Sequence, residues 1–210
     1  VVMEVTHLAT LYHDDVMDQA DSRRGVATAH MVWGNNVAIL TGDLLFARAS
    51  NLVSGLGQES LQLQAQVFEQ LVLGQLHETI GPQDGEDALE HCIQVLRDKT
   101  GSLIALSAQL GAMLSGASES YQRPLKEFGE SIGIAFQLVD DIIDIQSTKS
   151  QSGKIAGTDL LAGVPTLPVL LLADHQDSAS KQLLVDITEH LDESTLPEIL
   201  VRLRAHQVME

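Results

Sequence analysis

Residues 13–18, HDDVMD, and residues 139–144, VDDIID, are two copies of one pattern, Asp-Asp-x-x-Asp. Each copy lies in an apolar stretch that is compatible with a helix. On a helix, positions i and i+4 share a face and position i+1 lies one step around it, so each copy aims two carboxylates one way with a third beside them. Three like charges this close cost free energy unless a cation lies among them. The pattern therefore predicts divalent-metal ligands at Asp14, Asp15, Asp18, Asp140, Asp141 and Asp144.

The composition indicates one acidic, folded domain. The chain has 210 residues, of which 44% are hydrophobic and 20% charged, so it can bury a sizeable core. Its formal net charge of −17 argues against nucleic acid as a partner, because duplex binding depends on clustered Lys and Arg, and against an anionic membrane surface. An anionic substrate stays compatible with this charge if metal ions bridge it to the carboxylates.

The sequence carries few signals of its compartment. Cys92 is the only cysteine, so neither an intramolecular disulfide nor a cysteine-rich zinc site is expected, which is consistent with the cytoplasm. No signal segment is seen at the start and no apolar run approaches about 18 residues, so no membrane span is expected. The chain opens VVMEVTHLATLYHDD as if within a helix and ends LRAHQVME without a stop signal, so we expect further residues at both ends.

Helical periodicity runs through almost the whole chain, with little of the sustained alternation that predicts strands. Helices are expected over residues 1–18, 30–53, 60–80, 87–116, 123–145, 166–173, 178–191 and 196–206. Segments rich in turn formers predict loops at 18–28, 54–58, 81–87, 115–122 and 147–159. The helix at 87–116 is expected to be interrupted at 99–101, KTG, and a polar break in an apolar helix often marks a site. The pattern predicts an all-α fold.

The residues of the two clusters favour Mg²⁺, which binds a few carboxylates, retained waters and phosphate oxygens. Ca²⁺ fits less well because no EF-hand loop is present, and zinc fits less well because the clusters contain no Cys or His ligand. His13 precedes Asp14 but would point away from it on a helix, so we expect it to pack against the core or to support the ligands and not to bind the metal.

Basic and polar residues near the clusters are candidates for binding an anion. Arg23 and Arg24 follow the first cluster in a Gly-containing loop, which suits bidentate capture of phosphate; a surface pair that balances an acidic chain is an equally good interpretation. Gln137 lies one turn before the second cluster, where a core-edge glutamine would look the same, and Lys154 taken alone is an exposed lysine. The candidate substrate-binding residues are Arg23, Arg24, Lys99, Thr100, Gln137 and Lys154.

The chain contains no GxSxG elbow, Cys-His signature, P-loop or GxGxxG motif. What it offers is metal carboxylates, cations and an apolar helical interior. This combination suggests departure of a diphosphate from a hydrocarbon, with metal and cations stabilising the leaving charge and the interior excluding water from a carbocation-like fragment.

These motifs resemble the trans-isoprenyl diphosphate synthase (polyprenyl synthetase) family, as a bacterial medium- or long-chain member. The matching segments follow in family order over about residues 5–172: HDDVMDQADSRRG, TAHMVWGNNVAILTGDLLFARA, KTG, FQLVDDIIDI and GKIAGTDLLAGVPTLP. The resemblance implies an isoprenoid synthase fold, an orthogonal helical bundle around a central cavity, built from residues 1–210 as a single domain that lacks the N-terminal helices. It also implies a homodimer.

The resemblance further implies condensation of isopentenyl diphosphate with an allylic diphosphate, with release of pyrophosphate and with Mg²⁺, or Mn²⁺ as a substitute, as cofactor. The first cluster would hold Mg²⁺ on the allylic diphosphate and the second would do so from the opposite wall. The implied catalytic residues are Asp14, Asp15, Asp18, Lys99, Asp140 and Asp141. Arg23, Lys99 and Lys154 would contact the allylic diphosphate and Arg24 the isopentenyl diphosphate, while Thr100 and Gln137 would line the reacting end.

Two departures from the family are visible. Its N-terminal Gly-Lys-Arg motif, which binds isopentenyl diphosphate, does not occur in this sequence, and Val164 stands where the family often has Lys. The residues one and two turns before the first cluster are small, namely Thr6, Ala9 and Thr10. Short-chain members block this floor with aromatic residues, so we expect a product of geranylgeranyl length or longer.

Three other functions are alternatives to prenyl chain elongation. A class I terpene cyclase has the same fold but usually a different second motif. A subunit of a heterodimeric synthase tends to lose its Asp motifs, and this chain keeps both. A purely structural acidic helical protein would leave the repeated clusters unexplained.

Overall fold

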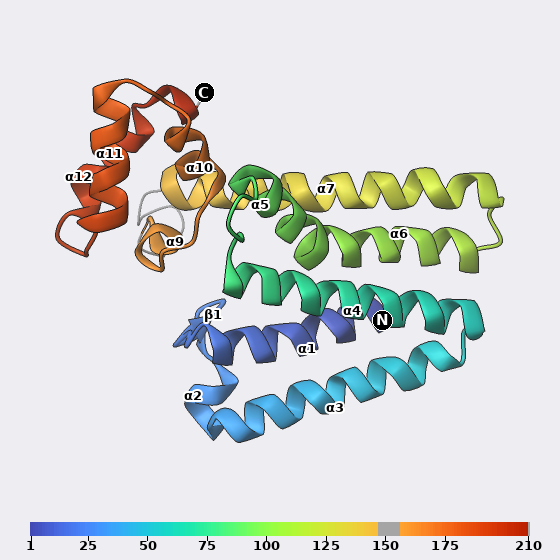
Figure 1. Ribbon diagram of the computed structural model, residues 1–210. Coiled ribbons are helices and arrows are strands. Elements are labelled where there is room, and N and C mark those ends of the chain that lie inside the picture. The colour runs from blue at the N-terminus through green and yellow to red at the C-terminus, as the bar shows by residue number, and fades with distance from the viewer. Residues whose placement is uncertain (147–155, 210) are drawn as a thin grey trace. The chain divides into compact units, whose positions relative to one another are not determined.

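The computed structural model describes residues 1–146 and 156–209. These residues form helices joined by short connections, which confirms the predicted all-α class (Figure 1). The elements are α1 (Val2–Met17), β1 (Ser22–Arg23), β2 (Val26–Ala27), α2 (Ala29–Trp33), α3 (Asn35–Ser54), α4 (Gln58–Ile80), α5 (Ala88–Leu96), the π-helical turn η1 (Arg97–Gly101), α6 (Ser102–Leu114), α7 (Glu119–Gln146), α9 (Thr158–Leu161), α10 (Leu167–Ala173), α11 (Ser178–Glu189), α12 (Leu196–Arg204) and the 3₁₀ turn η2 (Gln207–Met209).

The chain divides into two compact units. Unit 1 comprises Val1–Leu71 and Ser102–Gly129, and unit 2 comprises Val72–Gly101 and Glu130–Glu210. Helices α4 and α7 therefore each contribute residues to both units. The first aspartate cluster belongs to unit 1 and the second to unit 2.

In unit 1, α1 packs along α3. The buried positions of α3 are Ala38, Gly42, Ala49 and Val53, whose spacing places them on one helical face. A Cβ atom at Gly42 would lie 2.2 Å from His13 Nε2 and 3.2 Å from the carbonyl oxygen of Ala9. Glycine thus lets the two helices approach closely, with His13 packed at their contact.

Helix α3 is the one helix in the described part of the chain that is long and apolar enough to span a membrane, judged by length and composition. The same test is passed by core helices of proteins that do not enter membranes. In the structure, 22% of the apolar window of α3 is buried, on the face of small residues that packs along α1.

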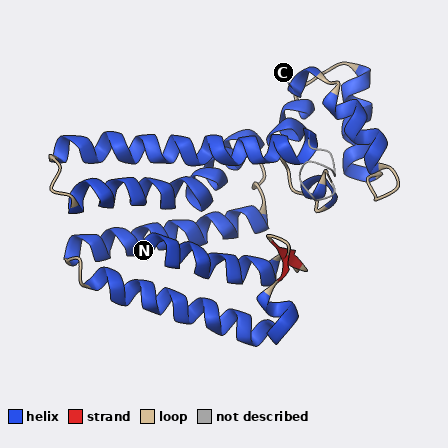
Figure 2. Cartoon of the chain, turned by 180° about the vertical axis from the view of Figure 1, so that it is seen from behind, coloured by secondary structure: helices blue, strands red, loops and turns tan. Residues whose placement is uncertain are grey.

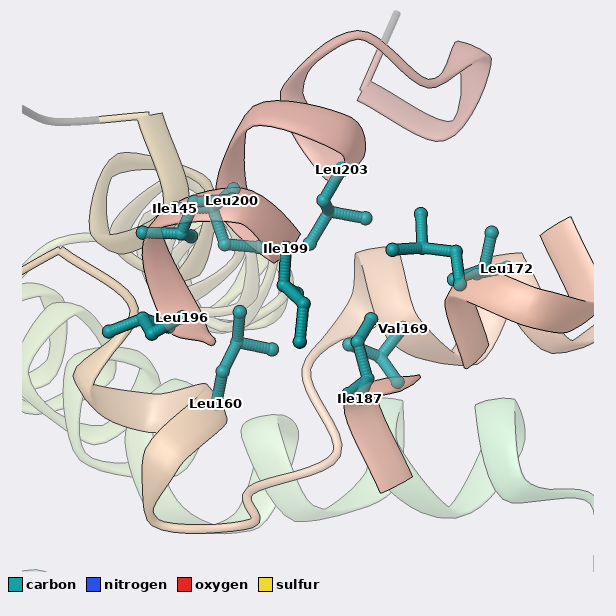
Figure 3. Close-up of a cluster of buried hydrophobic side chains, with 10 residues drawn as sticks. Ile145, Leu160, Val169, Leu172, Ile187, Leu196, Ile199, Leu200 and Leu203 are labelled. Carbon is teal, nitrogen blue, oxygen red and sulfur yellow. The ribbon is translucent and has the colours of Figure 1, made fainter. Parts of the chain in front are cut away.

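Unit 2 has a hydrophobic core at the C-terminal end of α7. Figure 3 shows side chains from α7, α9, α10, α11 and α12 directed toward one another. The ten buried residues are Ile145, Leu160, Val169, Leu172, Leu183, Ile187, Leu196, Ile199, Leu200 and Leu203. Arg204 Nε also donates a hydrogen bond to the carbonyl oxygen of Ile145 at 2.7 Å. These contacts fix the end of α7, which carries the second cluster.

Several predicted boundaries were wrong. The loop at 18–28 contains the antiparallel pair β1–β2, the only strands in the residues that the structure describes (Figure 2). The helix expected at 30–53 is broken at Gly34, whose φ of 85° is unfavourable for other residues. Helix α7 begins at Glu119 and accommodates Pro124, and the short helix α9 lies where a loop was expected.

Candidate active site

The first aspartate cluster lies at the C-terminal end of α1. Asp15 is buried, Asp14 is half-buried and Asp18 caps the helix end in an exposed position. The C-terminus of a helix carries a partial negative charge, so three carboxylates there need positive charge nearby. Arg23 Nε supplies it by donating to Asp15 Oδ1 at 2.6 Å.

The position of Arg23 depends on a two-residue hairpin. Arg23 pairs with Val26 across β1 and β2, and the loop residues Arg24 and Gly25 both have positive φ, 54° and 80°. Positive φ at both loop positions is typical of a type I′ turn, which matches the twist of a hairpin. Thr28 closes the base of the hairpin, since its hydroxyl donates to the carbonyl oxygen of Ala20 at 2.6 Å.

The hairpin gives the two arginines of the predicted phosphate-binding pair different surroundings. Arg23 is half-buried against Asp15, whereas Arg24 occupies the turn and is exposed. The sequence pattern suggested a shared role because the two residues are adjacent. The hairpin itself could not be predicted from the sequence, because strands of two residues are too short to show the alternation of apolar and polar residues by which strands are recognised.

The buried face of α1 below the cluster is made of small side chains. Thr6, Ala9 and Thr10 are all buried, and Ala9 has no exposed surface. The hydroxyl of Thr6 donates to the carbonyl oxygen of Val2 at 3.0 Å, and that of Thr10 to the carbonyl oxygen of His7 at 2.8 Å. Because each hydroxyl is satisfied by its own helix, the face turned inward is apolar.

The second aspartate cluster is carried by the last turns of α7. Asp141 is buried, with 8% of its surface exposed, while Asp144 is half-buried and Asp140 exposed. Gln137 Nε2 donates to Asp141 Oδ1 at 3.4 Å, and the Thr100 hydroxyl donates to Gln137 Oε1 at 3.4 Å. This relay orients the Gln137 amide so that its NH₂ group faces the carboxylate.

Burial raises the pKa of Asp141, and the charges of Asp140, Asp144 and Glu78 raise it further, while the Gln137 hydrogen bond acts in the opposite direction. A buried carboxylate surrounded by other carboxylates is stabilised by a cation. The donor set therefore fits a hard divalent metal.

Asp144 also organises the backbone that follows. Its Oδ2 accepts the N–H of Asp159 at 3.2 Å, and its carbonyl oxygen accepts the N–H of Gly157 at 3.0 Å. Gly157 has a φ of 78°, and a Cβ there would lie 2.8 Å from Leu196 Cδ1. Asp144 thus attaches the start of α9 to the end of α7, a contact that the sequence did not predict.

The predicted ligand Lys154 lies outside the described residues, and Val164 is exposed.

The interruption predicted at KTG is confirmed as the π-helical turn η1. Single π turns inside helices are often found at functional sites. Lys99 Nζ donates from this turn to Glu78 Oε2 at 2.5 Å. Glu78 was not a sequence candidate, although it lies one turn after Gly74 on a helix that approaches η1 closely.

In residues 1–146 and 156–209, no three His, Cys, Asp or Glu side chains are arranged to hold a metal ion by themselves. Mg²⁺ takes only one or two carboxylates in most phosphate sites and completes its octahedron with water and phosphate oxygens. The carboxylates therefore fit a metal that arrives with an anionic ligand. Unit 1 brings together the first cluster and Arg23, and unit 2 brings together Thr100, Gln137 and Asp141.

The sequence is similar to that of proteins of one known family. A family model described as polyprenyl synthetase matches residues 1–201. A nonaprenyl diphosphate synthase of Mycobacterium tuberculosis is 52% identical over 169 residues, which are 80% of this chain and 50% of that protein. Heptaprenyl diphosphate synthase component 2 of Geobacillus stearothermophilus is 41% identical over 86% of this chain and 57% of its own length.

A solved structure supports the fold. The geranylgeranyl pyrophosphate synthase of Corynebacterium glutamicum, complexed with calcium and isoprenyl diphosphate, aligns with a TM-score of 0.85 and 44% identity. The alignment covers 99% of this chain and 63% of that one, so the chain spans between half and two thirds of the length of these relatives. The all-α fold is thus that of the isoprenyl diphosphate synthases, and the chain belongs to the polyprenyl synthetase family.

Proposed function

We propose that the chain is the catalytic region of a Mg²⁺-dependent trans-polyprenyl diphosphate synthase. It condenses isopentenyl diphosphate with an allylic diphosphate of farnesyl or geranylgeranyl type, forms a linear all-trans polyprenyl diphosphate and releases pyrophosphate. The observation that carries the proposal is that each compact unit contains an aspartate cluster and a basic side chain bonded to a carboxylate. In unit 1 this pair is Arg23 and Asp15, and in unit 2 it is Lys99 and Glu78. A site of alternating carboxylates and cations suits a metal-bound diphosphate.

In this proposal each of the two clusters holds Mg²⁺, for which Mn²⁺ is a substitute. Bound metal would neutralise the diphosphate and stabilise the charge of the leaving pyrophosphate. Arg23, Lys99 and Lys154 bind the allylic diphosphate and orient it, and Arg24 contributes to the isopentenyl diphosphate site. The Thr100–Gln137 pair lines the reacting end, where its polar groups help to stabilise positive charge on the allylic fragment.

The small, apolar face of Thr6, Ala9 and Thr10 supports a product of geranylgeranyl length or longer. The names of two relatives, a nonaprenyl and a heptaprenyl diphosphate synthase, agree with a medium or long chain. We further propose that the protein acts in the cytoplasm as a homodimer and that residues 1–210 belong to one catalytic domain.

One relative favours a second candidate function. Because a similar protein is called component 2 of a heptaprenyl diphosphate synthase, the chain could instead act as one subunit of a heterodimeric synthase. A class I terpene cyclase is less well supported, since the second Asp-Asp-x-x-Asp triplet is complete.

One assay separates these functions. The purified protein is incubated with Mg²⁺, farnesyl diphosphate and labelled isopentenyl diphosphate, and the products are extracted and sized. Longer linear diphosphates support the proposal, whereas cyclic hydrocarbons support a cyclase. Absence of turnover that is restored by a partner subunit supports the heterodimer, and absence of any turnover contradicts the proposed activity.

A further inference from the structure

The π turn η1 is packed tightly against α4 by a glycine. A Cβ at Gly74 would lie 2.8 Å from Asp98 Cβ and 3.0 Å from the backbone nitrogen of Lys99, so no larger residue fits there without movement. On its other side, a Cβ at Gly101 would lie 3.2 Å from the carbonyl oxygen of Glu130. The turn that carries Lys99 therefore has a fixed backbone position relative to α4.

This close approach places Glu78, one helical turn after Gly74, against the side chain of Lys99. Glu78 Oε2 accepts hydrogen bonds from Lys99 Nζ at 2.5 Å and from Gln75 Nε2 at 3.1 Å. The Lys99 and Glu78 side chains are 29% and 32% exposed. The pair is thus reachable by a ligand, while its carboxylate is oriented by the Gln75 amide.

An ammonium group has three N–H donors, and a contact with one carboxylate oxygen uses one of them. Lysine is otherwise a point charge on a flexible stem, so a partner that fixes its head also fixes the direction of the remaining donors. Glu78 is also near enough to Asp141 for its charge to affect that carboxyl group. Glu78 therefore restrains the Lys99 ammonium within the unit that carries the second aspartate cluster.

We propose that Glu78 is a positioning residue that holds Lys99 for binding the diphosphate of the allylic substrate. This inference rests on the proposed function for the substrate, but it assigns a role to a residue outside both aspartate motifs. Glu78 keeps its hydrogen bond to Lys99 while the other two N–H groups of the ammonium meet phosphate oxygens. It acts through Lys99 and has no separate contact with the reacting atoms.

A double-mutant cycle tests the proposal. We expect Glu78→Gln to lower kcat/KM about tenfold, mainly by raising KM for the allylic diphosphate. Glu78→Asp keeps the charge but withdraws the carboxylate by one methylene, so it should behave like Glu78→Gln. In a Lys99→Met background, Glu78→Gln should have no further effect, because Glu78 acts only through that lysine.

A matched control is available on the same turn. Arg97 Nε forms an ion pair with Glu130 Oε1 at 2.8 Å, and the two side chains are 37% and 33% exposed. Glu130 lies on α7, and Glu130→Gln removes the same charge from the partner of a basic residue on the same turn, so it should leave KM unchanged. Thermal unfolding of each variant separates lost positioning from lost stability.

Binding of inorganic pyrophosphate with Mg²⁺, followed by calorimetry, gives a readout that does not need turnover. The proposal is supported if Glu78→Gln weakens pyrophosphate binding when Lys99 is present but has no effect in the Lys99→Met background. This result counts even if the condensation assay fails. Equal effects of Glu78→Gln with and without Lys99, or a Glu78→Asp variant that behaves as wild type, overturn it. If wild type condenses substrates while pyrophosphate binding is insensitive to Glu78, only the positioning role is wrong.

Discussion

The two aspartate clusters are nearly identical in sequence, but the protein restrains them differently. In unit 1, Asp15 is paired directly with Arg23, a charged partner that the hairpin delivers from eight residues away. In unit 2, the described partner of Asp141 is the neutral amide of Gln137, while Lys99 of the same unit donates to Glu78. Asp144 accepts a backbone N–H from Asp159.

The difference shows that the same sequence motif can have two different electrostatic surroundings. The first cluster has positive charge bonded to its buried member, while the second keeps a buried carboxylate whose pKa is raised by burial and by three neighbouring carboxylates. Metal binding should therefore relieve more repulsion at the second cluster than at the first.

Loss of one carboxylate from either cluster should have the largest effect. We expect Asp15→Asn and Asp141→Asn each to reduce product formation about 10²–10³-fold, because charge on the departing pyrophosphate is then less well stabilised. Initial rates with farnesyl and isopentenyl diphosphates at saturating Mg²⁺ measure this. If one variant retains wild-type rates, that cluster does not bind the metal that assists the reaction.

Only the first cluster should control product length. Ala9 lies five residues before Asp14 and is fully buried, whereas Ala135 lies five residues before Asp140 and is exposed. A phenylalanine at Ala9 should fill the space below the first cluster and shift the main product to a shorter prenyl chain. Chromatography of the dephosphorylated products measures the shift.

Ala135→Phe is the matched control for this experiment and should leave product length unchanged. Because Ala9 is packed near Gly42 of α3, thermal unfolding of Ala9→Phe must accompany the assay. A folded Ala9→Phe enzyme with the wild-type product distribution would show that Ala9 is not the floor of the cavity.

The same two Asp→Asn changes should have opposite effects on stability without metal. Asp15→Asn loses a charge-assisted bond with the partly exposed Arg23 and should lower the free energy of unfolding by about 1 kcal/mol. Asp141→Asn removes a buried charge that its neighbours repel and should raise it by about 1 kcal/mol. Denaturant unfolding at neutral pH without divalent metal measures both, and changes of equal sign would contradict the contrast between the clusters.

Local patterns explain which parts of this comparison could be predicted from the sequence. The i, i+4 spacing of Gln137 and Asp141 predicted that they share a face, and the polar KTG break predicted the irregular turn at η1. The Lys99–Glu78 pair joins residues 21 positions apart and depends on the close helix approach at Gly74, which no local pattern reports. The hairpin that delivers Arg23 was missed because its strands contain two residues each.

Cys92 should report the charge of the second cluster, with the smallest of the expected effects. Burial, together with the negative charges of Asp141 and Glu78, raises the pKa of the Cys92 thiol from 9.0 to about 11. Because the thiolate is the reactive form, native protein at pH 8 should have about 100-fold less of it than unfolded protein. The native reaction rate with a thiol reagent should still rise above about pH 10, where the rate of unfolded protein has levelled off. Asp141→Asn should move the midpoint of this rise to lower pH, since a repelling negative charge is gone, and Asp15→Asn should not move it. A midpoint that is the same in wild type and both variants would show that Asp141 carries no charge that Cys92 senses.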